Sequence, residues 1–127
     1  MRYPYSSTFD PPAPLFEITL SLPVTGGVIN SAISPALLDT GADISVIPQH
    51  IIDELGLLPF QTTKVKYSGG DIREEIVYAI NVIVAGVGSK IIGAVSSSNR
   101  KHVLLGRDFV NYFILHLEHR NNFFELI

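Results

Sequence analysis

Regular alternation of apolar and polar residues near the start of the chain is the feature that most restricts its fold. Residues 16–22 read Phe-Glu-Ile-Thr-Leu-Ser-Leu, and this period of two is typical of a strand with one buried face. The Gly26-Gly27 pair that follows permits the positive φ of a tight turn. We expect residues 28–34 to return as the partner of a hairpin. The chain therefore starts in the manner of a β-protein.

Short apolar runs between turn residues continue this pattern along the chain. Further strands are expected at 64–67, 76–84, 90–95 and 102–106, and in two pieces on either side of Asn121-Asn122. Two other segments have the helical period, namely 48–55, with Pro48 in its first turn and Gly56 after its end, and 107–113. The expected fold class is therefore all-β, with two short helices.

The composition describes one compact domain with a proline-rich start. The chain has 127 residues, of which 46% are hydrophobic and 17% charged. A chain of this length buries about two-thirds of its unfolded surface, which suffices for one core. Several prolines interrupt residues 1–14, and proline favours extended backbone. We expect an extended arm over 1–14 and a folded domain over 15–127.

Charge and residue usage exclude several classes of function. The formal net charge of −3 provides no basic surface for nucleic acid. The chain has no cysteine, which excludes disulfides and thiolate zinc sites. His116 and His119 lie three positions apart on an expected strand and would point to opposite faces, so we expect no metal site and no cofactor. With no apolar run typical of a signal or a membrane span, we expect a cytoplasmic protein without a membrane partner.

The segment Leu-Leu-Asp-Thr-Gly-Ala-Asp, residues 37–43, places a carboxylate at the end of an apolar strand. A carboxylate can act as a general base when its surroundings hold it in position. A threonine hydroxyl can brace such a loop, and glycine allows other backbone to approach closely. Asp-x-Gly is also ordinary turn chemistry. The tripeptide alone leaves both interpretations open.

A second motif favours the catalytic interpretation. Ala-Leu-Leu-Asp-Thr-Gly-Ala-Asp at 36–43 is followed by Val-Leu-Leu-Gly-Arg-Asp-Phe at 103–109. This pair resembles the retropepsin-like aspartic proteases, the family of the retroviral proteases and their relatives. The helix over 48–55 favours the cellular or bacterial branch. The resemblance implies a closed, barrel-like half-enzyme that hydrolyses peptide bonds in peptide or protein substrates.

The resemblance also implies that two copies of the chain are needed for one active site. The chain has a single Asp-Thr-Gly, so Asp39 would meet its counterpart in a homodimer and the two carboxylates would activate a water. Thr40 would brace the two loops, and Gly41 would present backbone to substrate. Ala42 occurs in the retroviral branch where pepsin-like enzymes usually have serine, which suggests a less acidic working pH.

Two further groups of residues acquire roles from the resemblance. Asp43 and Arg107 would form a structural ion pair between the aspartate loop and the last helix; otherwise they are a turn residue and a solvated first-turn residue. Asp108 would be a helix N-terminal charge.

The hairpin over 64–80 would be the flap that closes over substrate, with Ser68, Gly69, Gly70 and Asp71 at its tip. An ordinary hairpin loop is the alternative interpretation. The rival to the protease as a whole is a non-catalytic dimerisation or peptide-binding module with the same fold.

Overall fold

The computed structural model describes residues 1–23 and 30–127. Its strands are β1 (Arg2–Pro4), β2 (Leu15–Ser21), β3 (Ser31–Leu38), β4 (Val46–Pro48), β5 (Pro59–Lys66), β6 (Ile72–Val84), β7 (Gly88–Ser97), β8 (Val103–Leu105), β9 (Leu115–Glu118) and β10 (Phe123–Leu126), and its helices are α1 (Gln49–Leu55) and α2 (Arg107–Val110). Strands therefore dominate, and the described residues contain two short helices, as predicted.

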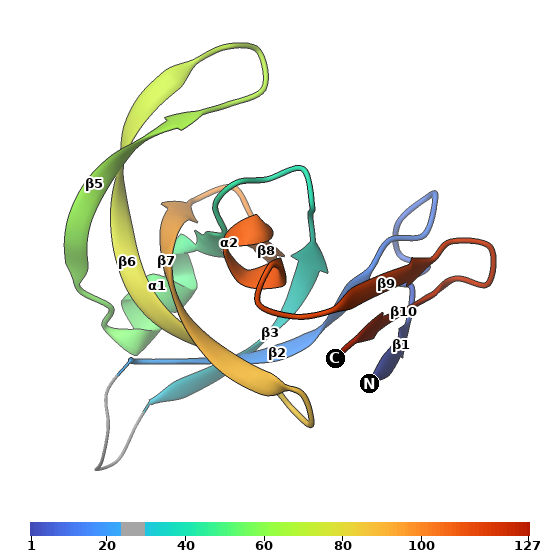
Figure 1. Cartoon of the computed structure of the whole chain (residues 1–127). Coiled ribbons are helices and arrows are strands. Elements are labelled where there is room, and N and C mark those ends of the chain that lie inside the picture. Colours follow the sequence, from blue (N-terminus) through green and yellow to red (C-terminus); the bar gives the residue numbers. More distant parts are fainter. Residues whose placement is uncertain (24–29) are drawn as a thin grey trace.

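The larger sheet closes into a barrel (Figure 1). Its strands follow in the order β2, β3, β8, β4, β7, β6, and a further pairing of β2 with β6 joins the two ends. β5 pairs with the first part of β6, residues 72–78. This arrangement confirms the expected barrel-like fold. Closure also leaves fewer strand edges exposed to other chains.

β2 pairs with β3 as the alternation predicts, although the partner strand is Ser31–Leu38 and not the predicted 28–34. The two strands are antiparallel and pair from Leu15–Leu37 to Ser21–Ser31. On β2, Phe16, Ile18 and Leu20 are buried, which is the apolar set of the period-two pattern. The predicted Gly26-Gly27 turn lies outside the described residues.

The first helix confirms the predicted pattern and differs at its start. Ile51, Ile52 and Leu55 are its buried residues, and Gly56 ends it in the left-handed conformation at φ 67°. Val46–Pro48, directly before it, form the short strand β4, which the sequence did not predict. β-branched residues favour extended backbone, and a proline disfavours helix in the residue before it. β4 pairs with β7 and β8, and so lies inside the barrel sheet.

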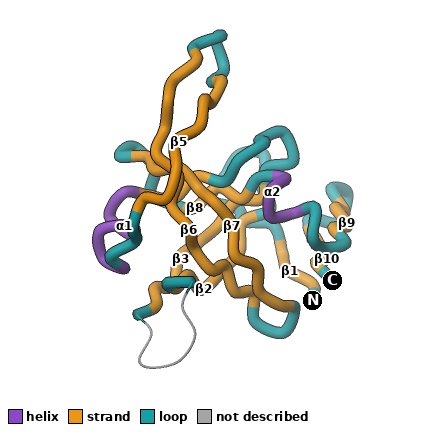
Figure 2. The backbone as a smooth tube through the Cα atoms, turned by 60° about the vertical axis from the view of Figure 1, so that its left-hand side comes forward, coloured by secondary structure: helices purple, strands orange, loops and turns teal. Residues whose placement is uncertain are grey.

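The β5–β6 hairpin projects beyond the barrel body (Figure 2). Residues 72–78 pair with β5 and residues 77–84 pair with β7, so the two pairings overlap at 77–78; three of the residues in the second set also pair with β2. At the tip, Gly69 and Gly70 have φ values of 98° and 92°, which favour glycine. The strand β5 is longer than the predicted 64–67.

The three-stranded sheet at the chain ends includes the first residues of the expected extended arm. β1 pairs with β10, and β10 pairs with β9 (Figure 1). Tyr3 stacks on Phe124, with ring centroids 5.1 Å apart, and contacts Phe16 of the barrel at 4.9 Å. The amino group of Met1 donates a 2.9 Å hydrogen bond to the carbonyl oxygen of Leu126. Aromatic packing therefore offsets the entropy of ordering these first residues.

A continuous apolar core joins the barrel to this small sheet. Phe109 of α2, Leu105 of β8 and Phe124 of β10 are all fully buried in it. Burying a side chain of this size stabilises a fold by about 1.5–3 kcal/mol. The core thus fixes β8 and α2, the segment that carries the second motif.

Candidate active site

The two sequence motifs lie against each other in the structure. The Asp39 amide donates to the carbonyl oxygen of Leu105 at 2.9 Å, and the Arg107 amide donates to that of Ala42 at 2.8 Å. Gly106 permits this approach, because a Cβ there would lie 2.7 Å from the Ala42 carbonyl oxygen. Segments more than sixty positions apart are therefore held by backbone bonds that depend on one glycine.

Asp39 is half-buried at the end of β3. The Gly41 amide donates to its Oδ1 at 2.9 Å, and a Cβ at residue 41 would lie only 3.2 Å from the same oxygen. This is the turn that the simpler interpretation predicted. Oδ2 has no hydrogen-bond partner among the residues that the structure describes, and Asp39 lines a large open cavity that is described below. The turn therefore holds one carboxylate oxygen and leaves the other available.

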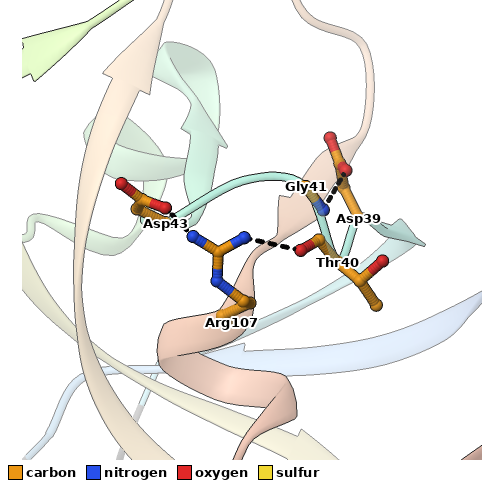
Figure 3. Close-up of polar contacts among 5 residues, drawn as sticks. All are labelled: Asp39, Thr40, Gly41, Asp43 and Arg107. Atoms are coloured by element: carbon orange, nitrogen blue, oxygen red, sulfur yellow. Dashed lines mark hydrogen bonds and ion pairs between the residues drawn. The ribbon is translucent and has the colours of Figure 1, made fainter.

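Arg107 connects two parts of the aspartate loop (Figure 3). One end of its guanidinium donates to the Thr40 carbonyl oxygen at 2.7 Å, and the other pairs with Asp43. The two predicted ion-pair residues are thus brought together. Asp43 is 85% exposed and the Arg107 side chain 44% exposed, so the pair orients the loop more than it stabilises the fold.

The Thr40 side chain points away from Arg107, and its hydroxyl bonds to no residue that the structure describes (Figure 3). Its carbonyl group, however, accepts the Arg107 bond. A single chain therefore leaves this exposed hydroxyl free, and Ala42, two positions on, lines the cavity.

Ser45 and Asp108 form a buried connection that the sequence did not reveal. Ser45 is fully buried; its amide donates to Asp108 Oδ2 at 2.9 Å and its hydroxyl to Oδ1 at 2.6 Å. The same hydroxyl accepts the Gly106 amide at 3.0 Å. Asp108 therefore binds the end of the aspartate loop from the first turn of α2. A serine beside two apolar residues has no pattern of its own, so only the fold identifies it.

A large open cavity lies beside Asp39. Its volume is about 1060 Å³, and its lining includes the aspartate loop, the end of β5 with residues 67–68 after it, part of β6, and residues 96–100 at the end of β7 and just after it. Of the predicted flap-tip residues only Ser68 lines it; Gly69, Gly70 and Asp71 lie beyond its lining. The cavity is large enough for several residues of an extended peptide.

The inner face of the β5–β6 hairpin carries a polar cluster. The Tyr67 hydroxyl donates to Glu75 Oε1 at 2.7 Å, and the Arg73 guanidinium lies 5.0 Å from the Tyr67 ring centroid. Burial, followed by the bond to Glu75, raises the pKa of Tyr67 above its usual 10.0. Tyr67 is therefore a neutral donor at every working pH of interest.

The described residues contain no group of three potential metal ligands. His119 instead shares a 2.8 Å hydrogen bond with the Tyr5 hydroxyl, and His116 is exposed on β9. Within the described residues, the helices are also too short to cross a membrane.

The fold and this loop arrangement define a retropepsin-like class, and comparison with known proteins agrees. A family described as "gag-polyprotein putative aspartyl protease" matches residues 25–112. Since the match spans most of the chain, the protein belongs to this family of retroviral-type aspartyl proteases. None of the curated proteins matches the chain.

A solved structure is similar to this chain over most of its length. It is described as the foamy viral protease-reverse transcriptase in complex with RNA/DNA hybrid, and it matches with a TM-score of 0.55 and 19% sequence identity. The match covers 80% of this chain and 12% of that chain. At this identity the likeness supports the fold, and the nucleic acid belongs to that longer protein.

Proposed function

We propose that the protein is an aspartic endopeptidase in which two copies of Asp39, one from each chain of a homodimer, hydrolyse a peptide bond. The observation that carries the proposal is the Asp39 carboxylate itself. One oxygen is held by the Gly41 amide at 2.9 Å, while the residue lines a cavity that can hold an extended peptide. Family membership supports the choice of protease chemistry.

A second carboxylate is required by the chemistry. Two aspartates about 3 Å apart cannot both be ionised, so they share one proton. The ionised member takes a proton from a bound water, whose oxygen attacks the carbonyl carbon, while the protonated member donates to the carbonyl oxygen. When the tetrahedral intermediate breaks down, the amine leaves with a proton and the acid product keeps the water oxygen. The described part of one chain offers Asp39 no second carboxylate within hydrogen-bond distance, which supports the dimer.

The surrounding residues fit supporting roles in this proposal. The free Thr40 hydroxyl would bond across the dimer to the partner loop, and Gly41 and Ala42 leave space for substrate. Arg107 and Asp43 would keep the loop in position through the contacts described above. The β5–β6 hairpin would act as the flap, with Ser68, Gly69, Gly70 and Asp71 at its tip. The protease domain would comprise residues 15–127, with the start of the chain added through β1.

The proposal is tested by digestion of a denatured protein between about pH 3 and pH 8. Wild type is compared with Asp39→Asn and with Asp53→Asn, a matched change on the exposed side of α1. Wild type and Asp53→Asn should cut, and Asp39→Asn should not. Activity per chain should also rise with protein concentration, because only the dimer is active. Equal cutting by all three proteins would contradict the proposal.

A folded protein that binds peptides without cutting them would instead support the alternative, a non-catalytic dimerisation or peptide-binding module. The same Asp39→Asn variant separates the two, because binding without chemistry does not require the carboxylate. Sedimentation across a concentration series completes the test, since a strict monomer would hold only half of the proposed site.

A further inference from the structure

We propose that Arg100 binds a carboxylate of the substrate, so that the enzyme prefers peptides with an acidic group near the cleaved bond. The inference rests on the proposed protease function. Arg100 lies in the segment between β7 and β8, and it lines the same cavity as Asp39. The residue as a whole is half-buried, and it lines the cavity in which substrate would lie.

Arg100 has no counter-charge in the described part of the chain. It takes part in none of the ion pairs there and in no side-chain hydrogen bond. The undescribed residues 24–29 include no acidic residue. A planar guanidinium with its donors unused is well suited to a carboxylate, which it can bind through two parallel hydrogen bonds.

The carboxylates of the cavity have other partners. Asp43 pairs with Arg107, and Glu75 accepts the Tyr67 hydroxyl. Asp39 is bound by the Gly41 amide and is committed to the proposed chemistry. None of these cavity carboxylates pairs with Arg100, so its guanidinium is available to a carboxylate from outside the chain.

The other cations of the cavity are less suited to this role. Lys64 and Lys66 are exposed on β5, where they alternate with the half-buried Val65 and Tyr67. Arg73 lies 3.8 Å from Asp71 and above the Tyr67 ring. Together with Arg100 they give the cavity lining four cations against the three carboxylates Asp39, Asp43 and Glu75, a small local excess of positive charge that favours a weak positive potential in a protein whose formal charge is −3. Such a potential attracts acidic peptides, and Arg100 supplies the specific contact.

A carboxylate near the cleaved bond could come from an aspartate or glutamate side chain or from the end of a short peptide. The test uses three synthetic peptides built on one cut site found by digesting denatured casein. One carries glutamate beside the cut and a C-terminal amide, the second carries glutamine there with the amide, and the third carries glutamine with a free C-terminus. The kcat/KM of each is measured with wild type, Arg100→Gln, Arg100→Lys and Lys101→Gln.

Lys101→Gln is the matched control, because it removes the same charge from the next residue, which is exposed and does not line the cavity. We expect wild type and Lys101→Gln to prefer an acidic peptide over the neutral one about tenfold, as a charge-assisted hydrogen bond allows. Arg100→Gln should lose the preference and Arg100→Lys should keep part of it. A preference for the glutamate peptide would identify an acidic side chain as the source of the carboxylate, and a preference for the peptide with a free C-terminus would identify the end of a short peptide.

Three outcomes would overturn the inference. These are equal kcat/KM for all peptides with wild type, a preference that survives in Arg100→Gln, and a loss in Arg100→Gln that is the same for acidic and neutral peptides. Binding of fluorescent versions of the peptides to Asp39→Asn separates this inference from the proposed function. Arg100-dependent binding of acidic peptides without any cleavage by wild type would support the carboxylate site and reject the protease.

Discussion

Replacement of Ser45 by alanine tests the buried connection between the aspartate loop and α2. The change removes the 2.6 Å bond from the serine hydroxyl to Asp108 Oδ1, and it also removes the acceptor of the Gly106 amide at 3.0 Å. A hydrogen bond to a charged group contributes about 1.5–3 kcal/mol, and a buried amide without a partner costs about 1–3 kcal/mol. The bond from the Ser45 amide to Asp108 remains and limits the loss. We expect the free energy of unfolding to fall by about 2–4 kcal/mol.

The matched control is Ser34→Ala. Ser34 is also buried, 3% exposed, but its hydroxyl donates only to the carbonyl oxygen of the adjacent Pro35 at 3.0 Å. We expect this change to cost less than about 1 kcal/mol. The two free energies are measured by urea unfolding, followed by far-UV circular dichroism, at one protein concentration, because dimerisation would link stability to concentration.

The expected melting temperature of Ser45→Ala is lower than that of wild type by roughly 8–16 °C, from about 4 °C per kcal/mol for a domain of this size. Peptide cleavage should fall as well, since the bond fixes the end of the aspartate loop. A cost for Ser45→Ala within about 0.5 kcal/mol of that for Ser34→Ala would refute the reasoning, because it would mean that the Ser45 hydroxyl does not hold these segments together.

Three further predictions follow from other contacts. Gly106→Ala should destabilise the fold by at least about 2 kcal/mol, and by more than Gly93→Ala in the same urea assay, because the added methyl at 106 meets backbone at 2.7 Å whereas that at 93 meets side chains that can move. Burial, and to a smaller extent the charge of Arg100, lowers the pKa of His102 below 6.5. The contribution of neutral His102 to stability is therefore complete above about pH 6.5 and is lost as the pH falls through its folded-state pKa. Between about pH 7.5 and about pH 5, wild type should lose more free energy of unfolding than His102→Gln. Arg107→Lys should change stability by less than about 1 kcal/mol, because its bond to the exposed Asp43 is solvated, yet it should lower kcat/KM about tenfold through loss of the planar fork; equal effects on unfolding and on cleavage would contradict that separation.

Local patterns were sufficient where one segment determines its own structure. The alternation in β2 predicted its buried face, and the apolar stripe and terminal glycine predicted α1. The pairing of Asp43 with Arg107 followed from the family resemblance and is present in the structure. In each case the information lies in a few adjacent residues or in a pair of short motifs.

Features that depend on distant partners could not be predicted in this way. β1 forms because β10, at the other end of the chain, offers an edge and Phe124 offers a surface for Tyr3. β5 is exposed along most of its length and so lacks the alternation by which strands are recognised. The charge environment of Arg100 depends on which carboxylates the fold has already paired, and no spacing in the sequence encodes that.

The strand β6 has a mechanical consequence, because it belongs to two structures at once. Residues 77–84 pair with β7 in the barrel wall, and 81–83 pair with β2 on the other edge, while residues 72–76 pair with β5 alone and extend beyond the wall. Because β6 runs without a break from the barrel into the hairpin, any displacement of the hairpin tip would require bending of this strand. The stiffness of β6 would then set how far the hairpin can move away from the cavity and how quickly it returns, without any contact at the hairpin tip.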